Sequence, residues 1–281
     1  MRRIPNGILH LHRWIGPFGW GLLGLIMIMA LSPWLVPYDP YDIHMGLRLQ
    51  PSSLDYWLGT DGLGRDLLSR LLIGGRNTLG TSLAVLTISL LVGIPIGLIA
   101  GYAGGWIDRI FMRTADAFMA FPDFLVALVL SGLLGPHIIN LMLAIAAVKW
   151  IAYARIVRNI VRDEKEKEYI AVAHLNGLCP LQLLAKHLLP HALRHVIVLA
   201  SLDIGKITLL IASLSYIGLG MQPPAPEWGA MLNEGRVYFH QSPYLMIWPG
   251  LAIMISVALA SLTGDRIRAK LGIQAEGGAR G

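Results

Sequence analysis

Residues 78–102 read TLGTSLAVLTISLLVGIPIGLIAGY, and they lie in a segment, 77–107, that contains no Asp, Glu, Lys or Arg. An α-helix needs about 20 apolar residues to cross about 30 Å of hydrocarbon. In lipid the backbone must also satisfy its hydrogen bonds within the segment, so this run predicts a transmembrane helix. A membrane β-barrel would show short segments of alternating polarity instead.

Other apolar segments flank this one on both sides. They are residues 15–36, 117–134, 138–154, 196–219 and 244–262. The chain is 55% hydrophobic and 14% charged, whereas about a quarter of the residues of a soluble domain are charged. The run at 15–36 is longer than the apolar region of a signal peptide, so we interpret it as a retained first span. We therefore predict an all-α membrane protein with six transmembrane helices.

The basic residues predict the orientation of these spans. With the N-terminus in the cytoplasm, sixteen of the 23 Lys and Arg residues fall inside and five outside, as the preference of Lys and Arg for cytoplasmic loops requires. If 117–134 and 138–154 were one helix, five crossings with an outer N-terminus would fit the charges nearly as well. The Gly135-Pro136 pair between them is a strong helix breaker. It favours six crossings with both termini in the cytoplasm.

The chain is predicted to form one membrane domain, residues 15–271. A short cytoplasmic segment, 1–14, precedes it, and a Gly-rich tail, 272–281, follows and is predicted to be mobile. Two large loops interrupt the domain, an outer loop at 37–77 and a strongly basic cytoplasmic loop at 155–195.

Charge and cysteine content exclude several classes of function. The net charge of +6 would point to nucleic acid in a soluble protein. Here the basic cytoplasmic loops account for it, so we predict membrane lipid and no nucleic acid as a partner. Cys179 is the single cysteine, which excludes an intrachain disulfide and a cysteine-based zinc site.

The cytoplasmic loop contains the sharpest pattern in the sequence. Residues 168–177 read EYIAVAHLNG and residues 179–190 read CPLQLLAKHLLP. Gly177 suits the left-handed position after a helix, and Pro180 suits the first turn of the next helix. Pro190 is expected to stop that second helix before the fifth span. The pattern predicts helix, tight turn and helix at the membrane surface, although an ordinary amphipathic connector would look similar.

The spacing of this loop resembles the coupling loop of binding-protein-dependent ABC importer permeases. That motif is Glu-Ala-Ala, three residues, Gly, nine residues, Ile, one residue and Leu-Pro. The matching positions here are Ala171, Val172, Ala173, Gly177, His187, Leu189 and Pro190. Ala171 and His187 replace the Glu and the Ile. The resemblance implies that this loop binds in a cleft of an ATPase subunit, where a rigid helix pair transmits nucleotide-driven closure to the spans.

Two outer stretches narrow the resemblance. Residues 58–70 read LGTDGLGRDLLSR and residues 214–229 read LSYIGLGMQPPAPEWG. Both resemble the second permease of the peptide/nickel class of these importers, as do 248–250 and 264–268 near the end. The resemblance covers nearly the whole chain from about residue 37.

The class implies a type I ABC importer permease fold in the inner membrane, which moves its substrate by alternating access. The implied partners are a homologous second permease, two ATPase subunits that bind ATP and Mg²⁺, and a soluble periplasmic or lipid-anchored substrate-binding protein. The chain itself is expected to bind no cofactor and no metal.

Charged residues in the outer loops are candidate contacts for the substrate-binding protein. They are Asp61, Arg65, Asp66 and Glu227, with Trp228 beside them. A purely structural role is the alternative. Asp61 can cap a helix, and Asp66 can form an i,i+4 pair with Arg70.

Three charged residues fall within the predicted spans, namely Lys149, Asp203 and Lys206. A charge at that depth costs about 2.5–3.5 kcal/mol on insertion scales, so it faces a partner or a water-filled path. Asp203 and Lys206 are three residues apart on one helix and can pair. Either the pair fixes the register of the fifth span, or this span lines the translocation path and Asp203 meets a cationic substrate.

The fifth span also bears on the substrate. Many members of the class have an acidic residue just before the Leu-Ser-aromatic stretch, where this chain has Ile211. Nickel-type members tend to lack that acid, and residues 202–205 are similar to theirs. The resemblance therefore favours nickel or a nickel chelate as substrate, with dipeptides and oligopeptides as the alternative. His44, His137 and His240 are not spaced as a metal site.

Other functional classes lack their signatures. The chain contains no G-x-x-x-x-G-K-[ST] motif, so we predict that it is not an enzyme and that partner subunits hydrolyse ATP. An intramembrane enzyme would need a catalytic pair, and Asp203 has no obvious second Asp. An ion-coupled secondary transporter would show internal repeats and would need no coupling loop.

Overall fold

The computed structural model describes residues 11–271, apart from the side chains of residues 11–15 and 174. Most of the predicted N-terminal segment, 1–14, and the predicted tail, 272–281, lie outside the described residues. Within the described part the chain is helical, and its only strand-like pairing is an isolated bridge between Thr60 and Asp66. The prediction of an all-α protein is confirmed.

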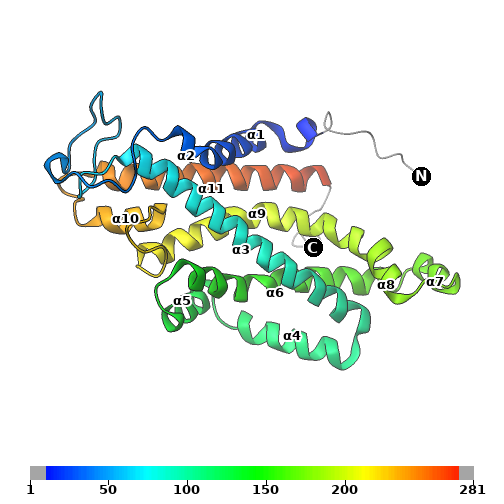
Figure 1. Cartoon of the computed structure of the whole chain (residues 1–281). Coiled ribbons are helices and arrows are strands. Elements are labelled where there is room, and N and C mark those ends of the chain that lie inside the picture. The colour runs from blue at the N-terminus through cyan, green and yellow to red at the C-terminus, as the bar shows by residue number, and fades with distance from the viewer. Residues whose placement is uncertain (1–10, 272–281) are drawn as a thin grey trace, which may run out of the picture.

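The helices follow one another in a single chain order (Figure 1). They are α1 (Leu11–Ala30), α2 (Ser32–Leu35), the 3-10 turn η2 (Met45–Leu47), α3 (Leu67–Ala103), α4 (Gly105–Met119), α5 (Asp123–Leu134), α6 (Ile138–Lys165), α7 (Glu168–Leu175), α8 (Pro180–Leu183), the π-helical turn η3 (Leu184–Leu188), α9 (Leu189–Tyr216), α10 (Trp228–Arg236) and α11 (Tyr244–Leu271).

Four continuous helical stretches in the described chain are long and apolar enough to cross a membrane. They are Leu67–Ala103, Ile138–Lys165, Pro180–Tyr216 and Tyr244–Leu271. They contain the predicted spans 78–102, 138–154 and 244–262, and most of 196–219. Sequence analysis underestimated their length because it counted only the apolar part of each helix.

The predicted third span, 117–134, is not a single helix. α4 and α5 meet at an angle of 90°, and Pro122 stands immediately before α5. Proline has no N–H to donate and disfavours helix in the residue before it, so the helix breaks there. α5 alone has 12 residues, too few to cross the hydrocarbon. Only the bent pair taken together qualifies as a broken span.

The predicted first span, 15–36, is also divided. α1 has a kink at Gly16, where φ is 65°, immediately before Pro17. α1 ends at Ala30, and the short α2 continues from Ser32 to Leu35. The apolar part of α1, Gly16–Ala30, is shorter than the four long helices.

Glycines at every fourth position of α3 bring this helix against the backbone of α6. They are Gly93, Gly97 and Gly101. A Cβ atom at any of them would lie 2.5–2.8 Å from a backbone carbonyl oxygen of α6. Small residues at this spacing let membrane helices approach closely. α3 and α6 therefore form one tightly packed pair.

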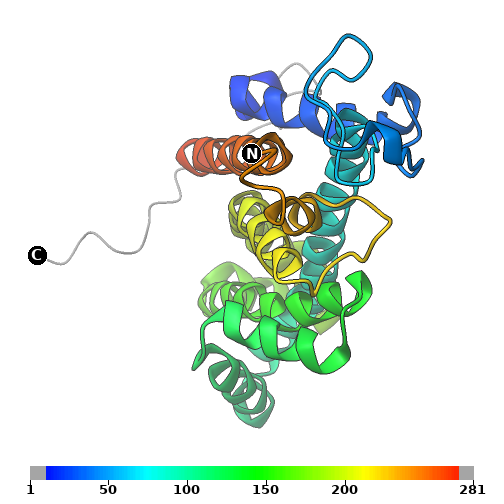
Figure 2. The same ribbon diagram turned by 90° about the vertical axis from the view of Figure 1, so that its left-hand side faces the viewer.

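The helices lie roughly along one direction, so the molecule has two ends (Figure 1). We call the end with residues 36–66 and α10 the outer end, and the end with α7 and α8 the inner end. The start of α1 and the end of α11 both lie at the inner end. Seen from the outer end, α11 lies between α1 and α9 (Figure 2), and it packs against both. α6 packs against α3, α5 and α9.

Candidate functional site

The segment from α7 to the start of α9 has the predicted form of two helices joined by a tight turn. Gly177 adopts the left-handed conformation with φ of 81°, which an L side chain rarely adopts. Pro180 is the first residue of α8, where a missing N–H breaks no helical hydrogen bond. We call residues 168–190 the coupling segment.

Pro190 does not stop the second helix, contrary to the prediction. It lies in the first turn of α9, and the π-helical turn η3 joins α8 to α9 without a break. The wider π turn lets the helix pass a residue that cannot donate a backbone hydrogen bond. The second half of the coupling segment and the following span are therefore one continuous helix, Pro180–Tyr216.

One side of the coupling segment is buried against the long helices. Ile170 and Ala173 of α7 belong to the same apolar core as Leu183 and Leu188. Tyr153, Val157 and Val161 of α6 and Ala192 and Val196 of α9 complete that core. The motif position Ala173 thus packs in the core that holds α7 against α6 and α9.

The other side of the coupling segment is exposed and carries several large apolar side chains. Val172, Leu175 and Leu181 have large exposed fractions, which reach 87% at Leu175. The motif positions Ala171, Gly177 and Pro190 are exposed as well, whereas His187 and Leu189 are half-buried. Apolar side chains gathered at an exposed tip are typical of a surface that contacts another protein.

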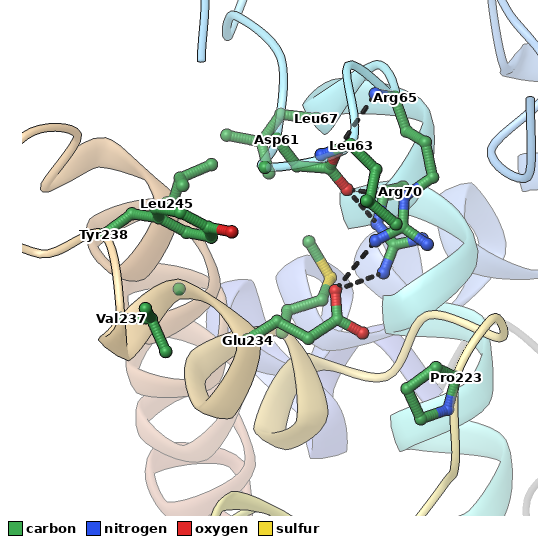
Figure 3. Close-up of a pocket in the computed structure, with 13 residues that line it drawn as sticks. Asp61, Leu63, Arg65, Leu67, Arg70, Pro223, Glu234, Val237, Tyr238 and Leu245 are labelled. Atoms are coloured by element: carbon green, nitrogen blue, oxygen red, sulfur yellow. Dashed lines mark hydrogen bonds and ion pairs between the residues drawn. The ribbon is translucent and has the colours of Figure 1, made fainter. Parts of the chain in front are cut away.

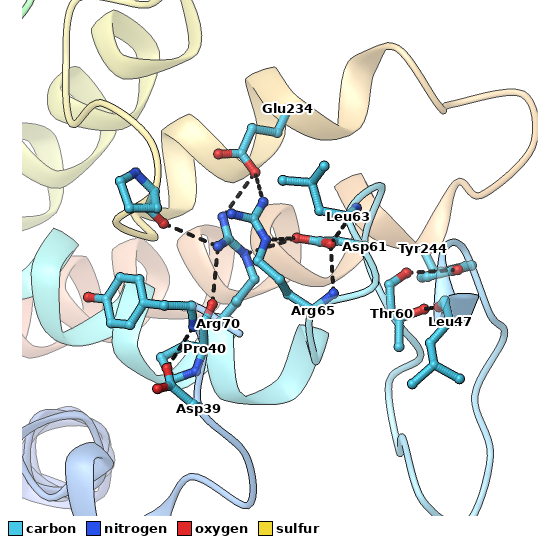
Figure 4. Close-up of polar contacts among 12 residues, drawn as sticks. Asp39, Pro40, Leu47, Thr60, Asp61, Leu63, Arg65, Arg70, Glu234 and Tyr244 are labelled. Carbon is cyan, nitrogen blue, oxygen red and sulfur yellow. Dashed lines mark hydrogen bonds and ion pairs between the residues drawn. The ribbon is translucent and has the colours of Figure 1, made fainter. Parts of the chain in front are cut away.

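Four charged side chains form a cluster at the outer end (Figure 4). Three of them are buried, and the side chain of Glu234 is 29% exposed. Asp61 binds Arg65 at 2.6 Å and Arg70 at 3.3 Å. Glu234 of α10 binds the same two arginines at 3.0 Å and 2.9 Å. We call these residues the outer charge cluster. Its two positive and two negative groups balance, as a buried set of charges requires.

The outer charge cluster borders a cavity of about 250 Å³ (Figure 3). Leu63, Val237 and Tyr238 are among the apolar residues that line the rest of this cavity. The cluster thus holds the outer loop, the first turn of α3 and α10 together around it.

Two other predicted contact residues cap helices at the outer end. The carboxylate of Asp66 accepts hydrogen bonds from the backbone N–H and the hydroxyl of Ser69, and so caps α3. Glu227 accepts from the N–H groups of Gly229 and Ala230, and so caps α10. Asp66 therefore does not pair with Arg70 as predicted, because its carboxylate caps the helix.

All five predicted binding-protein contacts are buried in this structure. Asp61, Arg65, Asp66, Glu227 and Trp228 are each less than a tenth exposed. Trp228 donates from its indole nitrogen to the carbonyl of Leu71 at 2.9 Å. These residues support the shape of the outer surface from within, and their direct contact with a binding protein stays a prediction.

Sequence analysis missed Glu234 as a member of the outer charge cluster, and it assigned Arg70 the wrong partner. Glu234 lies 164 positions from Arg70 along the chain, and no motif connects the two. The outer loop already contains five Asp for its four Arg, so its charge gave no signal that a distant acid was needed.

The three charged residues of the spans all have partners. Asp203 is 4% exposed and accepts a hydrogen bond from the hydroxyl of Tyr153 at 3.0 Å. The ammonium of Lys206 lies 3.7 Å from Asp203, and its side chain is 68% exposed. Lys149 binds Asp123 at 2.9 Å. Asp203 thus joins α9 to α6, while the side chain of Lys206 stays largely exposed.

Removing the acceptor of Tyr153 should weaken the α6–α9 contact. We expect Asp203→Leu and Tyr153→Phe each to destabilise the chain by about 1–3 kcal/mol, because each leaves a buried polar group without its partner. The double variant should lose less than the sum of the two single losses. Thermal unfolding in detergent measures all three. Lys206→Met should cost less than either variant, because the ammonium lies 3.7 Å from Asp203 and the lysine side chain is 68% exposed. Additive losses would contradict the pairing of Tyr153 with Asp203.

Residues 93–272 match the family model described as the inner membrane component of binding-protein-dependent transport systems. The chain belongs to this family. It is therefore an inner-membrane permease subunit of an ABC importer, a transport protein and not an enzyme.

Several curated permeases are similar to this member of the family over most of its length. The nickel transport system permease protein NikC of Escherichia coli is 40% identical over 91% of this chain and 93% of its own. The glutathione transport system permease protein GsiD of Pectobacterium atrosepticum is 40% identical over 88% and 83%. A probable D,D-dipeptide transport system permease protein, DdpC of Escherichia coli, is 38% identical over 90% and 85%. These relatives confirm the resemblance to the peptide/nickel class.

Proposed function

We propose that this chain is one of two homologous permeases of an importer for nickel bound to a small chelator. It crosses the inner membrane six times within residues 15–271, with both termini in the cytoplasm. The six crossings are α1, α3, the bent pair of α4 and α5, α6, the helix that ends with α9, and α11. This topology is supported by the start of α1 and the end of α11, which lie at the inner end, and by the basic loop 155–195, which contains the coupling segment.

The coupling segment binds an ATPase subunit in this proposal. The single observation that carries it is the exposed apolar tip formed by Val172, Leu175 and Leu181. The helices α7 and α8, which carry them, lie at the inner end of the molecule. Two ATPase subunits bind ATP and Mg²⁺, one at this segment and one at the corresponding segment of the second permease. Because α8 continues into α9, movement of the tip moves the fifth span directly.

The exposed face of α9 borders the translocation path. Lys206 lies within the helix Pro180–Tyr216, and its side chain is largely exposed. A charged side chain that faces hydrocarbon is costly, so this face meets water or the second permease. A positive charge there repels a bare divalent cation and attracts carboxylates. It therefore favours a nickel chelate that carries carboxylates over free Ni²⁺.

Alternating access then follows from the rigid connections within the chain. A substrate-binding protein delivers the substrate at the outer end while ATP closes the ATPase pair. The coupling segment carries this closure to α9 and, through their common core, to α6. ATP hydrolysis reverses the movement and releases the substrate inward.

The substrate is tested by ATP hydrolysis of the complex reconstituted with its binding protein. We expect stimulation by Ni²⁺ together with a carboxylate chelator, and little by either alone. Lys206→Met should weaken this stimulation. Lys149→Met should not, because the Lys149 side chain is only 12% exposed and binds Asp123 at 2.9 Å. Stimulation by glutathione or dipeptides alone would replace nickel chelate by peptide, the alternative that the similarity to the GsiD and DdpC proteins supports. Uptake that persists without ATP would refute the importer mechanism.

A further inference from the structure

Glu164 lies in the last turn of α6 and has an unusual environment for a carboxylate at a helix end. It is 6% exposed, and carboxylates are almost never so buried unless they are paired. Three side chains bind it. They are Lys167 at 2.7 Å, His191 at 3.0 Å and Tyr169 at 3.2 Å.

The partners of Glu164 come from both ends of the coupling segment. Lys167 and Tyr169 lie where the chain enters α7, and His191 lies in the first turn of α9. The two carboxylate oxygens have different partners. Oε1 binds the imidazole of His191, and Oε2 binds Lys167 and Tyr169. One side chain thus connects α6, the start of α7 and the start of α9.

We propose that Glu164 is a positioning residue that clamps the coupling segment to α6 and α9. It makes the tip and both long helices move as one body when the ATPase pair closes. The inference rests on the proposed role of the coupling segment and adds the residue that fixes its orientation.

The surroundings explain why a polar clamp is needed there. The apolar core beneath the coupling segment resists separation of the helices, but apolar contacts are not directional. Hydrogen bonds and ion pairs are directional, so a carboxylate with three such partners fixes the orientation of the coupling segment relative to α6 and α9, and its distance from them. Partial burial, and then the charge of Glu164, raise the pKa of the Tyr169 hydroxyl, so it keeps its proton and donates to the carboxylate.

A distance measurement tests the clamp without any knowledge of the substrate. Spin labels at the native Cys179, which is exposed, and at Asn159→Cys, on the exposed surface of α6, report the separation of the coupling segment from α6. In the complex with cysteine-free partners, we expect a narrow distance distribution that stays the same with and without trapped ATP. Glu164→Gln and His191→Phe should each broaden it several-fold.

The functional measurement is the amount of substrate transported per ATP hydrolysed. Both variants should lower this ratio several-fold while complex recovery stays normal. The ATPase pair still closes in these variants, but the coupling segment no longer transmits the full movement to α6 and α9. Glu166→Gln is the matched control, because Glu166 is an exposed acid two residues away. A distribution as narrow as that of the unchanged chain, or a loss only in proportion to unassembled complex, would overturn the clamp. If the unchanged complex transports peptides instead of nickel, only the substrate proposal fails.

Discussion

Gly97→Val should prevent α3 and α6 from packing and should abolish uptake. A Cβ atom at Gly97 would lie 2.5 Å from the carbonyl oxygen of Ala154 and 2.7 Å from the Cβ of Val157. Overpacking usually costs about 1–3 kcal/mol because side chains move aside. Here the obstacle is the backbone of α6, so the cost should exceed that range. Thermal unfolding of the purified chain and recovery of the complex measure the effect.

Gly80→Ala provides a matched control on the same helix. A Cβ atom at Gly80 has no neighbour within 4 Å, and alanine favours helix over glycine by about 1 kcal/mol. This variant should unfold at the same temperature as the unchanged chain or slightly higher. Equal losses in Gly80→Ala and Gly97→Val would show that the effect comes from removing glycine and not from contact with α6.

Arg70→Met should destabilise the outer end by about 3–5 kcal/mol, the cost typical of removing one partner from a buried ion pair. Arg70 is 1% exposed, and its loss leaves Glu234 with Arg65 alone. It also removes the hydrogen bonds to the carbonyl oxygens of Pro40 and Pro224. We expect a lower unfolding temperature and faster proteolysis in residues 37–66.

Arg76→Met is the control for this experiment, since Arg76 is an exposed arginine on the same helix. It should have little effect on unfolding. The double variant Arg70→Met with Glu234→Met separates the pair from the single charge. Replacing a buried ion pair by apolar residues is often close to neutral, so this variant should be more stable than Arg70→Met. A further loss of stability would contradict the pairing of these two residues.

The apolar spans could be predicted because the signal for them is local. Residues 78–102 need no distant partner to be recognised as a membrane helix. The errors arose where a contact or an adjustable turn decides the outcome. Pro122 breaks a helix, whereas Pro190 does not, because a π-helical turn precedes it. Sequence alone does not distinguish these two prolines.

In the candidate site, too, features set by neighbouring residues could be predicted and features set by tertiary contacts could not. The helix–turn–helix form of the coupling segment could be predicted from Gly177 and Pro180, since the turn depends on residues that are neighbours in sequence. The contacts of Arg70 with Glu234 and of Glu164 with His191 could not, because only the tertiary fold brings these residues together. The burial of Asp61, Arg65 and Asp66 could not be predicted for the same reason, and their contact with a binding protein stays a prediction.

The exposed ammonium of Lys206 has a consequence for the life of this protein in the cell. A newly inserted copy without its companion subunit would present that cation to the lipid acyl chains, and hydrocarbon solvates ions poorly. An orphan copy is therefore marked by its own surface, and that mark disappears when assembly covers it. The same lysine that we propose to border the translocation path would thus distinguish an unassembled copy from an assembled importer.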